Sequence, residues 1–92
     1  MSENNFESFK KAKLEEGFDE VLIRTWEPHF ANEAHTHPFD TAALVSDGEF
    51  WLTLGDDVTH YQAGDTFRVA RGVVHSERYG ASGAVFWAAR KN

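Results

Sequence analysis

The sequence predicts an all-β barrel with a short N-terminal helix, and three observations indicate it. After Gly17 the chain consists of short segments rich in Val, Ile, Thr, Phe, Trp and Tyr, separated by Gly, Asp, Asn and Pro at fairly regular spacing. Before Gly17 the periodicity is helical instead. About eight short strands on so small a body would leave many open edges, and closing the sheet into a barrel removes them.

The helix is expected over residues 4–16. Asn4 and Glu7 have the spacing of a capping box, which satisfies free backbone N–H groups at a helix start. Three apolar residues fall roughly on one helical face: Phe6, Phe9 and Leu14. Gly17 followed by Phe18 is typical of a glycine that ends a helix, accompanied by a hydrophobic contact.

The barrel is expected over residues 20–90, within one domain that spans residues 1–92. The candidate strands are residues 20–27, 33–37, 41–46, 49–54, 58–62, 66–70, 73–79 and 84–90. Turn-forming residues mark the breaks between them: Pro28, 47–48, 55–57, 64–65, 71–72 and 80–83. The chain after the helix is therefore read as strands and turns alone.

Charge and composition exclude several classes of function. The net charge is −6 and the longest basic cluster is confined to residues 10–13, so we expect no nucleic-acid partner. The absence of cysteine excludes disulfides, thiolate metal sites and cysteine nucleophiles. The N-terminus is polar and acidic, and the longest apolar run, residues 84–89, is too short to span a bilayer. We expect a cytoplasmic protein with no membrane partner.

Three of the five histidines are the strongest candidates for functional residues, as ligands of a metal ion. His35 and His37 are two positions apart, so on an extended segment both imidazoles project from the same face. With His75 on a facing strand, they would bind a divalent metal ion and leave positions open for substrate. The alternative is two surface histidines and one core histidine. His29 and His60 are expected on the surface, outside any site.

The residues around these histidines resemble the two motifs of the cupin superfamily. Six positions match the motifs at the right spacing: His35, His37, Gly48, Gly64, Gly72 and His75. Four positions depart, because the leading glycine, the glutamate, the proline and the final asparagine of the motifs fall on His29, Thr41, Ala70 and Tyr79. The resemblance implies a small single-domain cupin with a double-stranded β-helix, or jelly-roll-like, barrel. It also implies that the three matching histidines bind the metal.

The family's glutamate is normally the fourth protein ligand of the metal, and Thr41 stands in its place. Glu77 follows the third histidine by two residues, so on an uninterrupted strand it faces the same side and is our candidate catalytic carboxylate. The alternative is a surface carboxylate paired with Arg78 or Arg68. Asp40 is next to the vacant position, but it points outward unless a bulge intervenes.

The inner face of the predicted barrel supplies a candidate ligand cavity. Alternation along the strands places eight side chains there: Phe39, Thr41, Ala43, Phe50, Leu52, Phe67, Val69 and Tyr79. Of these we expect Phe39, Thr41, Phe50 and Tyr79 to contact the substrate. The alternative is that most of these side chains are ordinary core, since the interior of so small a barrel is largely filled.

The sequence therefore predicts a small metal-binding cupin that acts on or binds a small organic molecule. The cofactor would be one divalent transition metal, chosen from Fe, Mn, Ni, Co and Zn. If the protein is an enzyme, the resemblance implies dioxygenase-type or isomerase-type chemistry. The alternative is a non-catalytic ligand-binding or sensory module, with or without a metal. A metal-free structural cupin is a third reading.

We also expect a homodimer. If Phe50 and Leu52 face the core, Trp51 points outward, and Phe86 or Trp87 must also point outward in the last strand. Exposed aromatic residues grouped on one sheet of a small protein usually mark an interface. Light scattering should therefore report a dimer, and a monomer mass in concentrated solution would contradict this prediction.

Overall fold

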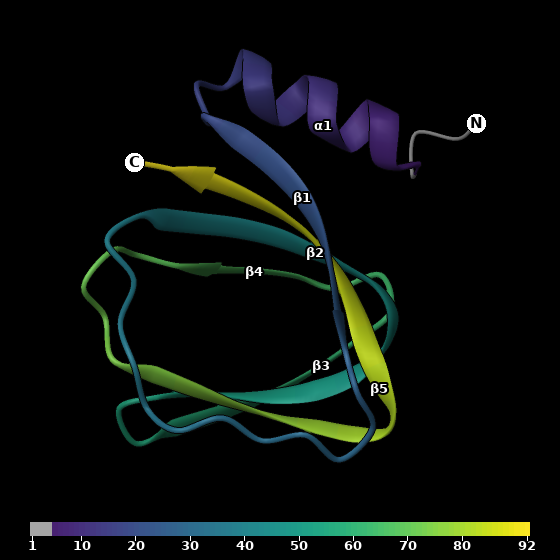
Figure 1. Ribbon diagram of the computed structural model, residues 1–92, viewed down its shortest axis with the longest axis vertical. Helices are drawn as coiled ribbons and strands as arrows, with labels where there is room; N and C mark the ends of the chain where they lie inside the picture. The colour runs from purple at the N-terminus through teal and green to yellow at the C-terminus, as the bar shows by residue number, and fades with distance from the viewer. Residues whose placement is uncertain (1–4) are drawn as a thin grey trace.

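The computed structural model describes residues 5–92 and shows an antiparallel β-barrel with a helix outside it (Figure 1). The elements in chain order are α1 (Phe6–Glu15), β1 (Glu20–Trp26), β2 (Asp40–Leu54), β3 (Asp57–Gln62), β4 (Thr66–Val69) and β5 (His75–Lys91). The predicted fold class, an all-β barrel with a short N-terminal helix, is confirmed. No helix among residues 5–92 is both long and apolar enough to cross a membrane.

Two long strands build the barrel. β2 and β5 pair along their whole length, from Asp40 opposite Lys91 to Leu54 opposite His75. The first half of β2 and the second half of β5 form one layer with β1 and β4. The second half of β2 and the first half of β5 form the facing layer with β3 (Figure 1). Each long strand thus contributes to both layers.

Two of the predicted turns are bends inside these long strands, and this part of the prediction was wrong. Residues 47–48 lie within β2, and residues 80–83 lie within β5. The pairing shifts register between Val45 and Asp47 and again between Gly48 and Phe50. Such β-bulges bend a strand sharply while it keeps its partner, so the chain passes from one layer to the other without a loop.

The predicted strand over residues 33–37 is also wrong, because the chain between β1 and β2 forms isolated bridges and no continuous strand, and only one of these bridges lies within residues 33–37. Ala31 bridges to Arg78, and His35 bridges to His75 with two backbone hydrogen bonds of 2.9 Å. Between these bridges the backbone N–H of Glu77 donates to the Asn32 side chain at 2.7 Å. A side chain that takes a ladder position interrupts the regular strand pattern.

The helix begins and ends close to the predicted residues. Asn5 is its N-cap, and the Asn5 side chain accepts a hydrogen bond from the backbone N–H of Ser8 at 2.7 Å. The predicted cap, Asn4, lies outside the described residues. At the other end Gly17 has a φ of +102°, and the Phe18 N–H donates to the Lys13 carbonyl, as expected for a glycine stop.

The two outward tryptophans lie on different layers, so the aromatic residues are not grouped on one sheet as we expected. Trp87 is in the β1 layer, where Phe6 and Phe9 of α1 contact it at ring distances of 5.9 and 5.8 Å. Trp51 is in the β3 layer, beside His60 and Arg78. α1 therefore covers one of the two surfaces from which the dimer was inferred, and the homodimer stays a prediction.

An aromatic core fills the barrel between the layers. The Phe50 ring lies 5.1, 5.6 and 4.6 Å from the rings of Phe67, Tyr79 and Phe86. Six residues predicted for the inner face are buried: Ala43, Phe50, Leu52, Phe67, Val69 and Tyr79. Phe86 joins them, which leaves Trp87 as the outward residue of the pair.

The loop after β1 has one strained residue, and relieving that strain should stabilise the protein. His29 is the one non-glycine residue with a positive φ, +60°, among residues 5–92, and it occupies the position of the leading motif glycine. A left-handed conformation costs a non-glycine residue about 1–2 kcal/mol. Replacing it with glycine removes this strain but also stabilises the unfolded state, because glycine has more conformational entropy there, so the net gain is smaller. We expect His29→Gly to raise the free energy of unfolding by up to about 1 kcal/mol.

Urea denaturation of the parent and His29→Gly measures this difference. His60→Gly is the matched control, because His60 is an exposed residue inside β3. Glycine within a strand should lower stability by roughly 0.5–1 kcal/mol. A loss of stability in His29→Gly similar to that in the control would contradict the prediction.

Candidate metal centre

Three imidazoles converge at one side of the barrel interior. His35 and His37 lie in the segment between β1 and β2, and His75 is the first residue of β5. The ring centroids are 4.3 to 5.0 Å apart, and each histidine offers one nitrogen within 4.8 Å of the others. The two-bond bridge between His35 and His75 brings together residues forty positions apart.

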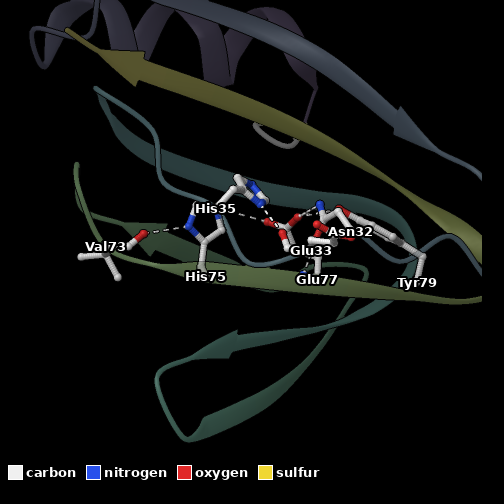
Figure 2. A network of polar contacts seen from close by, with 7 residues as sticks. All are labelled: Asn32, Glu33, His35, Val73, His75, Glu77 and Tyr79. Atoms are coloured by element: carbon white, nitrogen blue, oxygen red, sulfur yellow. Dashed lines mark hydrogen bonds and ion pairs between the residues drawn. The ribbon is translucent and has the colours of Figure 1, made fainter.

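Backbone carbonyls orient two of these rings. The Nδ1 atom of His35 lies 2.7 Å from the Glu33 carbonyl oxygen, and Nδ1 of His75 lies 3.0 Å from that of Val73 (Figure 2). Because a carbonyl oxygen only accepts, each Nδ1 carries a proton, and in the neutral ring the lone pair is on Nε2. This arrangement, in which one ring nitrogen donates and the other is free, is usual for metal-binding histidines.

The surroundings of the third imidazole favour its neutral form. The His37 ring stacks on Phe39 at 4.7 Å and lies 5.0 Å from the His75 ring. Burial, followed by the charges that His75 and His35 carry when protonated, lowers the pKa of His37 below its ordinary 6.5. At pH 7 the ring is therefore mostly neutral, the form in which an imidazole binds a metal ion.

Glu77 lies beside this cluster. Figure 2 shows His75, Glu77 and Tyr79 projecting from one side of β5 toward the segment that carries Asn32. Glu77 Oε2 is 3.6 Å from Nε2 of His75, and the carboxylate side chain is 11% exposed. Glu77 is thus largely buried next to an imidazole, which differs from the alternative of a surface carboxylate paired with an arginine.

Asn32 fixes Glu77 in place, and it was not among the predicted site residues. Its Nδ2 donates to Glu77 Oε1 at 2.5 Å, and its Oδ1 accepts from the Glu77 backbone N–H at 2.7 Å. The Tyr79 hydroxyl lies 3.5 Å from the same Oε1 atom. Burial and the Glu77 carboxylate raise the pKa of Tyr79 far above its ordinary value, so the phenol stays protonated. Nothing in the sequence around Asn32 signals this pairing, because its partner is 45 positions away.

Asp40 is not part of the cluster, although it is adjacent to Thr41. Its carboxylate accepts the Arg71 backbone N–H at 2.8 Å and lies 3.3 Å from the Arg71 guanidinium. These interactions, the backbone hydrogen bond first, lower the pKa of Asp40 below its ordinary value. Of the two carboxylates considered for the vacant glutamate position, only Glu77 lies next to an imidazole.

A cavity of about 100 Å³ adjoins the three histidines. Of the four predicted substrate contacts, Phe39 and Thr41 line it, whereas Phe50 and Tyr79 are in the core behind it, 0% and 1% exposed. The rest of the apolar wall is formed by Trp26, Phe67, Val69, Phe86 and Ala88. His29 and His60 do not line it, as expected.

The donor set suits a divalent transition metal. Three imidazole nitrogens with a nearby carboxylate oxygen match the preferences of Fe, Mn, Co, Ni and Zn. Calcium and magnesium prefer oxygen ligands, which this cluster largely lacks. The partly open cavity on one side would leave coordination positions accessible to a small ligand.

Comparison with solved structures shows the same fold in bacterial proteins. A conserved protein with a double-stranded β-helix domain from Klebsiella pneumoniae is 27% identical, with a TM-score of 0.67 over 78% of this chain and 65% of its own. A Rhizobium leguminosarum protein of unknown function is 14% identical, with a TM-score of 0.74 over 78% and 68%. KdgF from Halomonas is 16% identical, with a TM-score of 0.67 over 79% and 68%. This chain thus spans about two thirds of their lengths.

Comparison with protein-family models identifies the family to which this chain belongs. No curated protein matches this sequence. The family model described as "Cupin domain" matches residues 22–87, a segment that begins in β1, ends in β5 and contains all three histidines of the cluster. Since that match covers well over half of the chain, the protein belongs to the cupin family.

Proposed function

We propose that this protein binds one divalent transition-metal ion per chain through His35, His37 and His75, and uses it to bind or act on a small organic molecule. The convergence of the three rings supports this proposal most directly, because their ligand nitrogens lie within 4.8 Å of one another. The backbone hydrogen bonds at Nδ1 of His35 and His75 add support, since they leave both Nε2 atoms available.

A bound ion would supply a Lewis acid or an oxygen-activating centre. The protein's part would be to orient the substrate and to move a proton. Glu77 suits the second task because Asn32 holds its Oε1 atom, while Oε2 faces the imidazole of His75. A positioned carboxylate in a partly apolar site is a suitable general base. Phe39 and Thr41 would contact the substrate, since both line the cavity.

The two reaction types proposed for an enzyme of this kind are suggested by the cupin family, because the cavity itself indicates no particular reaction. Dioxygenase-type and isomerase-type chemistry both use a metal with open positions and a nearby base, as this site would provide. A non-catalytic sensory module would use the same cavity without turnover. Tight ligand binding with no consumption of any small molecule tested would favour that second function.

The direct test is metal analysis of protein purified without chelators or an affinity tag. We expect about one equivalent of metal per chain, with affinity falling as the pH decreases below about 6, because ligating imidazoles must be neutral. A protein that takes up no Fe, Mn, Co, Ni or Zn at neutral pH would overturn the proposal.

Removing the charge of Glu77 should weaken the site. Glu77→Gln keeps the shape, and a glutamine can retain a hydrogen bond with Asn32, but it cannot offset the ion's charge or accept a proton. We expect metal affinity or any activity to fall about 10- to 100-fold, the scale for losing a group next to the ligands. Isothermal titration with Zn²⁺ or Co²⁺ measures the affinity.

Glu49→Gln is the matched control. Glu49 is also a carboxylate next to a histidine, since its Oε1 atom lies 2.8 Å from Nε2 of His60, but that pair is outside the cluster. Its metal affinity should equal that of the parent. Thr41→Glu restores the family's glutamate at the cavity wall. If Glu77→Gln binds metal as tightly as the parent while Thr41→Glu binds more tightly, the site is a plain three-histidine site without Glu77.

A further inference from the structure

Two arginines line the cavity that holds the histidines. Arg24 is on β1 and Arg90 is on β5, and both lie in the wall with the apolar residues Trp26, Phe86 and Ala88. Strand alternation places them on the inner face of the barrel, which most small barrels fill with apolar side chains. An arginine in such a position loses part of its hydration, so its charge needs a partner.

The two arginines differ in their partners. Arg90 lies 3.6 Å from Glu20 Oε2, and its guanidinium stacks 4.6 Å from the Phe39 ring. The Arg24 guanidinium lies 5.0 Å from the Trp26 ring centroid, and no carboxylate among residues 5–92 is within 4 Å of it. Arg24 therefore presents its donors in the cavity wall without an acidic partner from the described chain.

The charge of the cavity is opposite to that of the molecule. The whole chain carries a net charge of −6, yet the cavity wall contains two arginines against one carboxylate, Glu77. Glu77 is itself engaged with Asn32 and faces His75, and a divalent ion at the histidines would add further positive charge. A concave, partly apolar site of one sign concentrates small ligands of the opposite sign.

We propose that the ligand of this cavity is a small carboxylic acid in its anionic form, and that Arg24 binds the carboxylate. A guanidinium donates two parallel hydrogen bonds to a carboxylate, a geometry that a neutral amide cannot match. The apolar residues Phe67, Phe86 and Ala88 would contact the hydrocarbon part, and the volume of about 100 Å³ limits it to a few carbon atoms. This inference rests on the proposed function in using the same cavity.

The test is a titration of the metal-free and the Zn²⁺-loaded protein with butyrate, butyramide and inorganic phosphate at constant ionic strength. Amide chemical shifts along β1 and β5 report binding, and so does the tryptophan fluorescence, to which Trp26 in the cavity wall contributes together with Trp51 and Trp87. We expect butyrate to bind, and to bind more tightly to the Zn²⁺-loaded protein, while butyramide binds at least about tenfold more weakly.

Variants assign the effect to one residue. Arg24→Gln should weaken butyrate binding about tenfold or more, and Arg24→Lys should weaken it less, since it keeps the charge but loses the fork. Arg78→Gln is the matched control, because the Arg78 guanidinium lies 4.6 Å from the Trp51 ring centroid and does not line the cavity. It should bind butyrate as the parent does. The amide spectrum of each variant verifies that it is folded.

Three results would overturn the inference: butyramide binding as tightly as butyrate, phosphate binding in preference to butyrate, or no effect of Arg24→Gln. Metal content measured on the same samples separates this inference from the proposed function. If the parent and Arg24→Gln bind metal equally but neither binds butyrate, only the inference fails. If no metal binds but butyrate binding depends on Arg24, the inference stands and the metal function fails.

Discussion

Replacing His75 with alanine should reduce metal affinity by about 100-fold or more, beyond the effect of losing a neighbouring group. His75 is the member of the cluster with the least exposed side chain, 2%, and its ring is oriented by the Val73 carbonyl. Without it, only His35 and His37, both in the segment between β1 and β2, would remain, and two imidazoles are too few to bind a divalent ion tightly. Isothermal titration with Zn²⁺ or Co²⁺, together with metal analysis, measures the change.

His60→Ala is the control for this experiment. His60 is an exposed imidazole bonded to Glu49 at 2.8 Å, and it is outside the cluster. Its removal should leave one metal ion per chain. Circular dichroism should show that His75→Ala keeps its β structure, because the backbone bonds of the His35 bridge do not require the side chain. Unchanged metal affinity in a folded His75→Ala protein would refute the three-histidine site.

The second large effect is expected at the bend where β2 passes between the layers. Gly48 has a φ of +77°, and a Cβ atom there would lie 2.1 Å from the Gly83 carbonyl oxygen and 2.9 Å from Ala84 Cα. Both contacts are with backbone of β5, which cannot move away without breaking the pairing of the two long strands. We expect Gly48→Ala to lower the free energy of unfolding by about 3 kcal/mol or more.

Gly55→Ala separates the close approach from the backbone strain. Gly55 also has a positive φ, +60°, but a Cβ atom there would meet no atom within 4 Å. Its substitution should cost only the left-handed conformation, about 1–2 kcal/mol. Urea denaturation of the parent and both variants gives the comparison. Equal losses in Gly48→Ala and Gly55→Ala would show that β5 does not restrict Gly48.

Local periodicity determined much of this fold. A helix that ends before Gly17 and strand segments from residue 20 onward follow from side-chain patterns a few residues long, and the structure has both. Alternation also predicted that Phe50 and Leu52 are buried and that Asp40 faces away from the histidines. These properties depend on neighbours along the chain, so the sequence carries them directly.

The continuity of the strands was not predictable in this way. The aspartate and glycine at residues 47–48 are compatible both with a turn and with a β-bulge, so the sequence there does not distinguish the two. Whether the chain reverses or bends there is decided by its partner strand, because β5 continues alongside β2 through the register shifts. The residue pattern alone therefore predicted more, shorter strands than the barrel contains.

Some features of the candidate site were likewise predictable from the sequence, and others were not. The spacing of His35, His37 and His75 and the alternation that brings Glu77 to the side of His75 are features of the sequence by itself. Only the tertiary structure pairs Asn32 with Glu77, turns Phe50 away from the cavity into the core, and places Arg24 in the cavity wall without an acidic partner. These relations join residues that are far apart in the chain, and closure of the barrel decides which of them meet.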